Sequence, residues 1–316
     1  MSSPADLRRL PVIGRRRTHF GPHFWRNTLH GYLFILPVVL GLLIWTIGPM
    51  LASAYYSLTD YNLLSPAKFI GTDNYVNLFT NDDLFFQSVL VTVHYAILFV
   101  LFSQLLSLGL ALLLTQNVRF LNIFRTLYYL PIVIPYIASA LLWRYLFDKD
   151  IGPINALLRL GGIQGPSWLG SPQWSLLSLV IISVWGSAVS TIIYVAGLQQ
   201  VPGDLYEAAD IDGAGGFAKF RKITIPMLSP TILFNVVTTV IAAFQFFVPA
   251  YVLTQGGPVD STYVYNLNLY DKAFSWLEMG YASAMAWVLF AIIMVLTGLI
   301  FRSSPLWVHY ENGEAR

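Results

Sequence analysis

The sequence predicts an all-α membrane protein with six transmembrane helices and a short cytoplasmic helix between the fourth and the fifth. The first observation is composition: of 316 residues, 56% are hydrophobic and only 11% are charged, whereas soluble domains carry about 25% charged residues. The second is a mean hydropathy of +0.62. The third is the presence of six segments as long as the roughly 20 apolar residues that a spanning helix needs. Lipid is therefore the solvent that this chain fits.

The composition also excludes several classes of site and partner. The chain has no cysteine, so disulfides, thiolate metal sites and iron–sulfur clusters are excluded. Its five histidines show no metal-ligand spacing, and its net charge of +2 is too small to indicate nucleic-acid binding. We therefore expect neither a metal site nor a nucleic-acid partner.

The first apolar segment follows an arginine-rich N-terminus, which leaves two interpretations. A cleavable signal peptide is one, since small residues follow in Leu51–Ala54. Signal-peptide cores are about 7–15 residues long, whereas this segment runs from Tyr32 to Tyr56. The length favours a first transmembrane helix that is retained.

The spanning segments are almost free of charge. They cover residues 32–56, 89–114, 124–146, 176–198, 226–253 and 279–301. Only the third contains charged residues, Arg125 and Arg144, which lie near its ends, where long side chains reach the headgroups. Prolines inside the third segment (Pro131, Pro135) and the fifth (Pro230, Pro249) predict kinked helices.

The distribution of Lys and Arg predicts the orientation, because cytoplasmic segments carry the excess. With the N-terminus inside, the inner segments hold thirteen: Arg8, Arg9, Arg15, Arg16, Arg17, Arg26, Arg119, Arg125, Lys219, Arg221, Lys222, Arg302 and Arg316. The outer segments hold five: Lys68, Arg144, Lys149, Arg159 and Lys272. We expect a cytoplasmic tail over residues 1–30, one membrane domain over 31–303 and a second cytoplasmic tail over 304–316.

The inner connection over residues 203–226 has an unusual sequence, which begins with small and acidic residues and ends with a basic cluster. Asp204 and Glu207 have the spacing of a capping box, with Asp204 at the N-cap. Gly213 is placed to end the short helix, and Pro226 to begin the fifth span. On these features alone, a loop whose Lys and Arg residues bind anionic lipid remains an alternative.

The spacing within this connection carries a resemblance. Glu207-Ala208-Ala209 is followed by three residues, Gly213, nine residues and Ile223-Thr224-Ile225-Pro226. This resembles the cytoplasmic EAA loop of permease subunits in binding-protein-dependent ABC importers, with Ile225 where leucine is usual. Residues 69–75 (FIGTDNY) and 253–258 (LTQGGP) are similar to two further motifs of the sugar branch, the maltose and glycerol-phosphate type.

The resemblance implies a coupling helix that docks on a separate ATP-hydrolysing subunit. The residues implied in that contact are Glu207, Ala208, Ala209, Asp212, Gly213 and Phe217. It further implies a bacterial plasma (inner) membrane location, a second homologous permease, two ATP-binding subunits and an extracellular or periplasmic sugar-binding protein. The chain has no GxxxxGK[ST] motif, so we expect no phosphate-binding loop, no enzymatic activity and no cofactor here. ATP and Mg²⁺ belong to the partner.

Polar and aromatic residues inside the spans are candidates for the substrate pathway, because sugars bind to aromatic faces and to hydrogen-bonding groups. The resembled sugar permeases contact substrate in the middle of the two helices that flank the EAA loop. Comparable places here hold Ser183, Trp185, Ser187, Gln245 and Phe246. For a Ser or Thr alone, bonding to its own helix is the commoner explanation. Helices four and five lack Lys, Arg, Asp and Glu, which indicates uncharged cargo.

Other functions remain as alternatives. Within the importers, the cargo could be glycerol phosphate or another polar solute, such as an amino acid or a peptide. A secondary transporter usually needs ionisable residues inside the membrane, and these spans carry almost none. A membrane-embedded enzyme would need acids, histidines or a nucleophile clustered at depth, and no such cluster is visible in the sequence.

The orientation can be tested with reporter fusions. Fusions after residues 120, 215 and 310 are expected to report a cytoplasmic location, and fusions after 75, 160 and 265 an external one, because Lys and Arg are concentrated on the first side. An external signal at residue 215 would contradict the assignment of residues 203–226 to the cytoplasm.

Overall fold

The computed structural model describes residues 22–116 and 119–309, with side chains described from residue 28 onward. It forms two compact units, Met1–Ala52 and Ser53–Arg316, and we describe each by itself. The predicted tails over 1–30 and 304–316 lie partly outside the described residues, as do five of the N-terminal arginines and Arg316.

The first unit consists of a long apolar helix. The helix ends at Tyr56, a few residues beyond the last residue of the unit, Ala52. Its parts are α1 (Pro22–Leu42), the π-helical turn η1 (Leu43–Ile47) and α2 (Gly48–Tyr56). The π turn precedes Pro49, which has no N–H to donate and so disturbs the regular helical ladder. Residues Thr28–Tyr56 form a candidate span of 29 residues, about 44 Å at 1.5 Å per residue.

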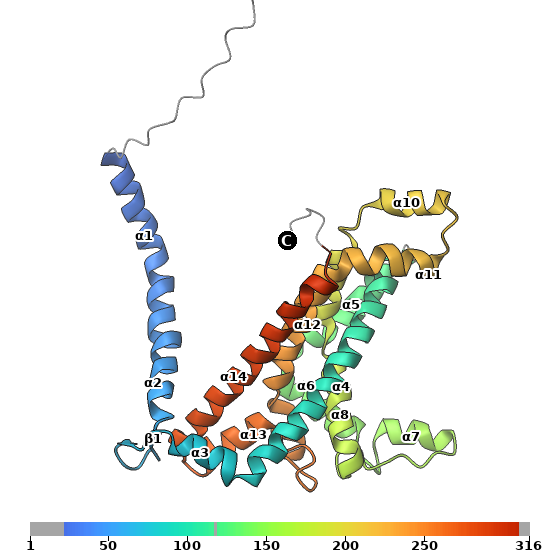
Figure 1. Cartoon of the computed structure of the whole chain (residues 1–316). Coiled ribbons are helices and arrows are strands. Elements are labelled where there is room, and N and C mark those ends of the chain that lie inside the picture. Colours follow the sequence, from blue (N-terminus) through green and yellow to red (C-terminus); the bar gives the residue numbers. More distant parts are fainter. Residues whose placement is uncertain (1–21, 117–118, 310–316) are drawn as a thin grey trace, which may run out of the picture. The chain divides into compact units, whose positions relative to one another are not determined.

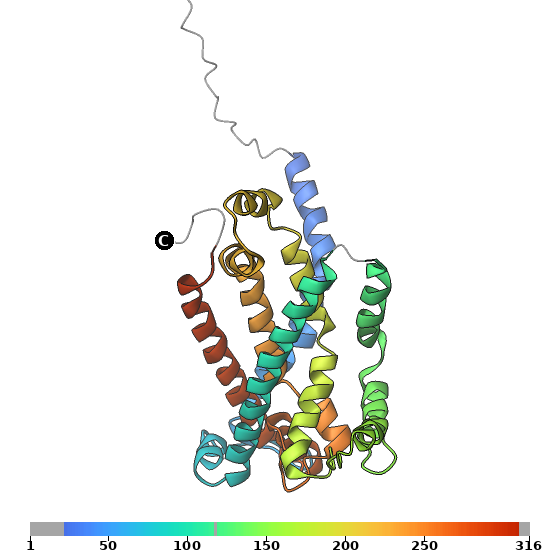
Figure 2. The same ribbon diagram turned by 90° about the vertical axis from the view of Figure 1, so that its right-hand side faces the viewer.

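The second unit, Ser53–Arg316, is a helical bundle with two very short strands (Figure 1). Its elements on the N-terminal side are β1 (Thr59–Asp60), β2 (Lys68–Phe69), α3 (Asp73–Thr80), α4 (Asp83–Leu114), α5 (Leu121–Val133), α6 (Tyr136–Leu146), α7 (Pro153–Leu160), α8 (Pro172–Trp185) and α9 (Ala188–Leu198). The remaining elements are α10 (Gly203–Ile211), α11 (Gly216–Lys219), η2 (Phe220–Thr224), α12 (Ile225–Phe244), η3 (Ala250–Thr254), α13 (Tyr265–Tyr270), η4 (Asp271–Ser275), α14 (Met279–Ser303) and η5 (Ser304–Leu306). Helix α10 lies at one end of this unit, and α3, α7 and α13 lie at the other (Figures 1 and 2).

Four helices of the described chain are long and apolar enough to cross a membrane, and two bent pairs raise the number to six if each pair is one span. The pair α5–α6 bends by 105° and the pair α8–α9 by 45°. The first bend follows from Pro135, because a residue before proline disfavours the helical conformation, and Ile134 is extended with ψ 127°. The prediction of a mostly helical membrane protein is confirmed, and so is the kink in its third segment.

The predicted fifth span, residues 226–253, is correct at its start and wrong at its end. Helix α12 begins at Ile225 with Pro226 in its first turn, follows α11 and η2 in one helical segment from Gly216, and ends at Phe244. Pro230 lies within it, and Pro249 lies beyond its end. Asn266 caps the C-terminal end of the helix. Its Nδ2 donates to the carbonyl oxygens of Phe244 at 3.1 Å and Phe246 at 3.5 Å. Carbonyl groups at a helix end lack partners within the helix.

A polar stripe on α4 ties the bundle together. Five buried polar residues recur at intervals of three, four or eight positions along one side of this helix: Ser88, Thr92, Tyr95, Ser103 and Ser107. Helix α4 packs against α8, α9, α12 and α13. The stripe therefore faces the interior of the bundle. It is turned away from the hydrocarbon of the membrane, which offers no hydrogen-bond partners.

Most of these polar groups bond across to neighbouring helices. Near the end of the unit that holds α3, Thr92 Oγ1 accepts from the backbone N–H of Tyr265 at 2.8 Å. Tyr95 donates to Ser183 Oγ at 2.8 Å. Helix α4 is thus joined both to α13 and to α8.

Gln104, next to the stripe, is the centre of a buried polar cluster. Its Nε2 donates to Thr239 Oγ1 at 2.8 Å, and its Oε1 accepts from the hydroxyl of Tyr194. Asn235 is fully buried beside it and donates to Ser190 O at 3.4 Å. This cluster joins α4, α9 and α12.

At the end of the unit that holds α3, Asn74 fixes the segment that follows the first helix. Strands β1 and β2 pair antiparallel, with Thr59 opposite Phe69. The buried Asn74 Nδ2 donates to Ser57 O and Thr59 O, each at 2.9 Å. Tyr75 adds a bond from its hydroxyl to Ser57 Oγ at 2.9 Å. The motif at residues 69–75 is therefore a structural clamp that holds α3 on β1.

Replacing Asn74 tests this clamp. Asn74→Ala leaves two buried carbonyl groups without donors, which is expected to destabilise the protein by about 1–3 kcal/mol. Thermal unfolding of the purified protein in detergent should show a transition several degrees lower. Asn77→Ala, one turn away and exposed, serves as the control and should unfold within about a degree of the wild type. Equal transitions for both variants would contradict the clamp.

Candidate functional site

The loop between α9 and α12 ends its first helix with a well-formed glycine cap. Helix α10 ends at Ile211, and Gly213 has φ +74°, a conformation that costs other residues about 1–2 kcal/mol. Ala214 N donates to Ala209 O at 2.9 Å, and Gly213 N donates to Asp210 O at 3.1 Å. This pair of bonds is the Schellman motif, so the prediction that Gly213 ends the helix is confirmed.

The predicted capping box is not formed. Helix α10 begins at Gly203, with Pro202 at the N-cap and no capping bond from a side chain. Pro202 has φ −59° and ψ 129°, so it is not helical itself, and the next residue, Gly203, is the first of the helix. Asp204 is therefore already inside the first turn, where its negative charge still favours the positive end of the helix dipole.

Two side-chain contacts hold α10 against the helix that follows. Lys219 Nζ lies 2.7 Å from Asp210 Oδ1. Deeper in the loop, Tyr206 and Thr224 share a hydrogen bond of 2.9 Å between their hydroxyls. The loop is therefore a folded unit rather than an extended connection.

The outward side of this loop carries apolar side chains. Ile211 is 88% exposed and Phe217 is 76% exposed. Of the other residues predicted to couple to a partner, Glu207, Ala208, Asp212 and Gly213 are exposed and Ala209 is half-buried. Exposed large apolar residues beside small residues and a carboxylate make a surface suited to another protein.

The loop continues without a break into the fifth span. Residues Gly216–Phe244 form one helical segment of 29 residues, with the π-helical turn η2 just before Pro226, which lacks an N–H. Phe217 lies at one end of this segment, and Gln245 and Phe246 follow the other. The loop and the residues Gln245 and Phe246 thus lie at opposite ends of one helical segment.

Two of the five predicted pathway residues meet in the bundle interior, at Tyr95. Ser183 and Phe246 are 8% and 7% exposed, and Tyr95 is 1% exposed. The ring of Phe246 stacks on the ring of Tyr95 with centroids 3.9 Å apart. Ser183 accepts a hydrogen bond from Tyr95 and donates to Leu179 O at 2.9 Å. These side chains form one packed aromatic and hydroxyl group.

The other three pathway residues lie at interruptions of the helices. Trp185 is the last residue of α8, and Ser187 lies between α8 and α9. Ser187 is buried, and its Oγ is 3.4 Å from Ser107 Oγ. Gln245 is the C-cap of α12 and is exposed. The five residues therefore do not line one surface.

Trp185 borders a cavity of about 450 Å³ at the bend between α5 and α6. Its lining is mostly apolar, with Tyr136 and Ser139 as the polar side chains. A space of this size fits the range of small-molecule pockets. Trp185 and the bent helix pair thus offer an aromatic wall beside hydroxyl groups.

Tyr95 was not among the residues predicted to line the pathway. No residue of its helix was predicted, and the histidine beside it, His94, is exposed. The available signal was the regular spacing of Ser88, Thr92 and Tyr95 within an apolar helix, since such a spacing places all three side chains on one side.

The turn over residues 253–258 is a compact structure at the end of the bundle away from α10. Gly256 has φ +85°, and a Cβ there would lie 2.4 Å from Tyr263 Cδ2, so only glycine fits. The Tyr263 hydroxyl donates to Asp271 Oδ2 at 2.9 Å. Burial raises the pKa of Tyr263, and the carboxylate raises it further. The hydroxyl therefore stays protonated near neutral pH.

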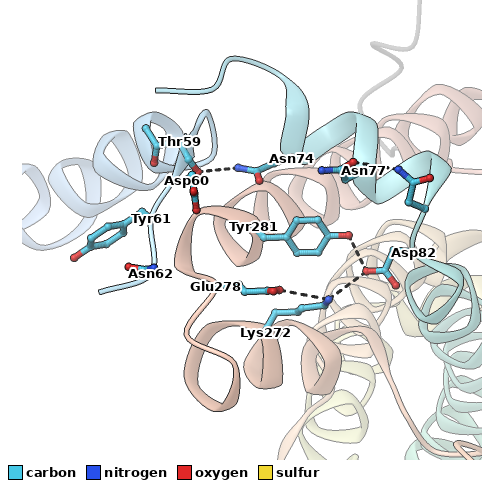
Figure 3. Close-up of a pocket in the computed structure, with 11 residues that line it drawn as sticks. Thr59, Asp60, Tyr61, Asn62, Asn74, Asn77, Asp82, Lys272, Glu278 and Tyr281 are labelled. Atoms are coloured by element: carbon cyan, nitrogen blue, oxygen red, sulfur yellow. Dashed lines mark hydrogen bonds and ion pairs between the residues drawn. The ribbon is translucent and has the colours of Figure 1, made fainter. Parts of the chain in front are cut away.

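A polar pocket of about 390 Å³ lies at the same end (Figure 3). Eleven residues line it: Thr59, Asp60, Tyr61, Asn62, Asn74, Asn77, Asn81, Asp82, Lys272, Glu278 and Tyr281. Lys272 Nζ lies 3.6 Å from Asp82 and 3.5 Å from Glu278, and Tyr281 donates to Asp82 at 2.7 Å. These contacts join the start of α4 to the start of α14.

Comparison with known proteins identifies the family. The family described as "Binding-protein-dependent transport system inner membrane component" matches residues 103–306. The chain belongs to this family. It is therefore a transport permease and a multi-pass membrane protein, and not an enzyme.

The sequence similarity between this permease and its relatives covers nearly the whole chain. The probable ABC transporter permease protein YesP of Bacillus subtilis (strain 168) is 42% identical over 293 residues, which are 92% of this chain and 94% of YesP. The probable starch degradation products transport system permease protein AmyD of Thermoanaerobacterium thermosulfurigenes is 32% identical over 275 residues, 87% of this chain and 93% of AmyD.

A solved structure shares the fold of the permease. It is the crystal structure of a bacterial alginate ABC transporter in complex with an alginate pentasaccharide-bound periplasmic protein. One chain of it matches with a TM-score of 0.78 and 22% identity, and covers 89% of this chain and 96% of that chain. At this identity the likeness establishes the fold alone.

Proposed function

We propose that this permease forms half of the translocation pathway of an ATP-driven ABC importer for a neutral sugar or oligosaccharide. The observation that carries the proposal is the folded loop over residues 203–226, with its glycine-capped helix and its exposed Ile211 and Phe217. The name of the relative AmyD, which refers to starch degradation products, supports a saccharide as cargo.

In this proposal the loop receives movement from an ATP-binding subunit. Phe217, Glu207 and the small residues Ala208 and Ala209 contact that subunit, and Asp212 lies at the end of the contact helix. Because Gly216–Phe244 is one continuous helix, closure of the ATP-binding subunits around ATP and Mg²⁺ shifts its far end. That end carries Gln245 and Phe246, so the pathway reorients without any cofactor in this chain.

The substrate pathway in this proposal runs past the interruptions of α8–α9 and α12. Trp185 and Phe246 supply aromatic faces, while Ser183, Ser187 and Gln245 supply hydrogen-bonding groups for hydroxyls. Tyr95 holds Ser183 and Phe246 in position. A polar group in a low-dielectric site is costly without a partner, and a sugar hydroxyl is such a partner for the exposed Gln245 amide.

The assembly consists of this chain, a second homologous permease, two ATP-binding subunits and an external sugar-binding protein. The end of the bundle that holds α10 faces the cytoplasm, together with both termini, and the end with α3 and α7 faces outward. Residues 31–303 then form one membrane domain with six spans, in which each bent helix pair crosses once, and residues 203–226 form the coupling loop.

The first test concerns coupling. Gly213→Val is expected to break the cap of α10, because valine resists a positive φ, and to leave ATP hydrolysis running with little uptake in reconstituted transporter. Glu207→Lys is expected to reduce co-purification of the ATP-binding subunits, because it reverses a charge at the contact. Gly215→Val is the matched control, since Gly215 has φ −69° and open space around its Cβ. Normal uptake by Gly213→Val and normal co-purification with Glu207→Lys would contradict the coupling role and indicate that the loop is only a lipid-facing connection.

The second test concerns the cargo. Uptake of neutral mono- and oligosaccharides and of their phosphorylated forms is compared in proteoliposomes that contain the assembled transporter and its binding protein. Neutral sugars are expected to be preferred by at least about tenfold, since an unpaired phosphate in a low-dielectric pathway is expensive. Gln245→Ala should lower that uptake while the ATP-binding subunits stay assembled. Gln200→Ala, an exposed amide beyond α9, should leave it unchanged. Preference for a phosphorylated substrate would contradict the neutral cargo.

A further inference from the structure

The pocket at the end of the bundle opposite α10 has the properties of a ligand site separate from the substrate pathway. Its volume is about 390 Å³, and all eleven of the residues that line it have polar side chains. Three further cavities of similar size, around Trp185 and Tyr128, are lined mainly by apolar residues. The polar lining separates this pocket from those three.

The base of the pocket is held by ion pairs and a cation–π contact. Lys272 is held between Asp82 and Glu278, and its ammonium lies 4.8 Å from the centre of the Tyr281 ring. The side chains of Lys272 and Asp82 are only 13% and 12% exposed. Figure 3 shows these groups gathered along one side of the pocket. A site fixed in this way loses little conformational entropy when a ligand binds.

Other residues that line the pocket have unused hydrogen-bonding capacity. Within the described residues, the Asp60 carboxylate has no hydrogen-bond partner. Asn77 uses its Oδ1 to accept from Asn81 at 3.1 Å, and its own NH₂ remains available. The Tyr61 ring is turned away from the Lys272 cluster (Figure 3) and stacks on Tyr56, with centroids 4.7 Å apart. The pocket thus offers both an acceptor and a donor.

The charge and the hydrogen-bonding groups together select the class of ligand. Three carboxylates (Asp60, Asp82, Glu278) and one ammonium (Lys272) give the pocket a formal charge of 3 × (−1) + 1 = −2, which disfavours anions. A metal ion would require acceptors only, whereas Asn77, whose NH₂ is not used in the described chain, also lines this space. Hydroxyl groups both donate and accept, so a polyol satisfies both kinds of group.

We propose that this pocket is a second binding site for an uncharged saccharide, formed by Asp60 and Asn77 beside the Lys272 cluster. Asp60 accepts from neighbouring hydroxyls of a sugar ring, and Asn77 donates to another. The site is independent of the pathway around Gln245 and holds sugar at the entrance of the permease rather than inside it.

Ligand binding by the purified chain in lipid nanodiscs tests the proposal without transport. Titrations followed by saturation-transfer NMR use maltose, methyl β-glucoside, glucuronate and spermidine as probes. At least one of the two neutral saccharides is expected to bind, and glucuronate is expected to bind more weakly because of the negative charge. Asp60→Ala should weaken saccharide binding by about tenfold, which corresponds to the loss of 1.4 kcal/mol.

Control variants separate this site from other effects. Asp150→Ala removes an exposed acid outside the pocket and should bind like the wild type. Gln245→Ala alters only the proposed pathway and should also bind normally at the outer site, so failure of one proposal is distinguishable from failure of the other. Asp60 makes no side-chain bond within the described chain, so Asp60→Ala is expected to keep the wild-type melting temperature. Absence of Asp60-dependent binding of either neutral saccharide, or preferential binding of spermidine or glucuronate, would overturn the proposal.

Discussion

The rest of this structure depends on one constraint, which is that a polar group on a helix in hydrocarbon must find its partner on a neighbouring helix. Helix α4 concentrates that requirement, because its buried polar stripe faces α8, α9, α12 and α13. The hydrogen bond from Tyr95 to Ser183 and the cluster around Gln104 form only when those helices have the correct rotation about their axes and the correct depth in the membrane. In lipid, apolar side chains alone specify such positions poorly, since the surrounding acyl chains are equally apolar.

This arrangement gives the bundle a mechanical consequence. Phe217 is on the loop and Phe246 is in the interior, and the unbroken helix Gly216–Phe244 lies between them. Phe246 is stacked on Tyr95 of α4, so the far end of this helical segment is packed against the centre of the bundle. In the proposed function, a movement of the loop would act at that contact.

The sequence was sufficient for features that depend on composition or on the conformation of one residue. The apolar spans follow from the requirements of the bilayer, and the end of α10 follows from the ability of Gly213 to adopt a positive φ. The kink near Pro135 follows from its effect on Ile134. The predicted capping box was wrong because Pro202, two residues before Asp204, is the N-cap of the helix, which begins at Gly203.

Features that depend on contacts between distant segments could not be predicted. The end of α12 at Phe244 is set by Asn266, which is 22 residues away, and by the stacking of Phe246 on Tyr95. Among the candidate pathway residues, the sequence named Ser183 and Phe246 but not the tyrosine that joins them. The polar pocket was equally hidden, because its two sides come from residues 59–82 and 272–281.

The central claim is that the loop over residues 203–226 transmits movement from an ATP-binding subunit to the bundle. Photo-crosslinking in intact membranes tests it most directly, with the photoreactive residue p-benzoyl-phenylalanine in place of Phe217. Phe69, which is 64% exposed at the other end of the bundle, is the matched control position. The account predicts an adduct with the ATP-binding subunit from position 217 and none from position 69. An adduct with that subunit from position 69, or with lipid alone from position 217, would contradict it.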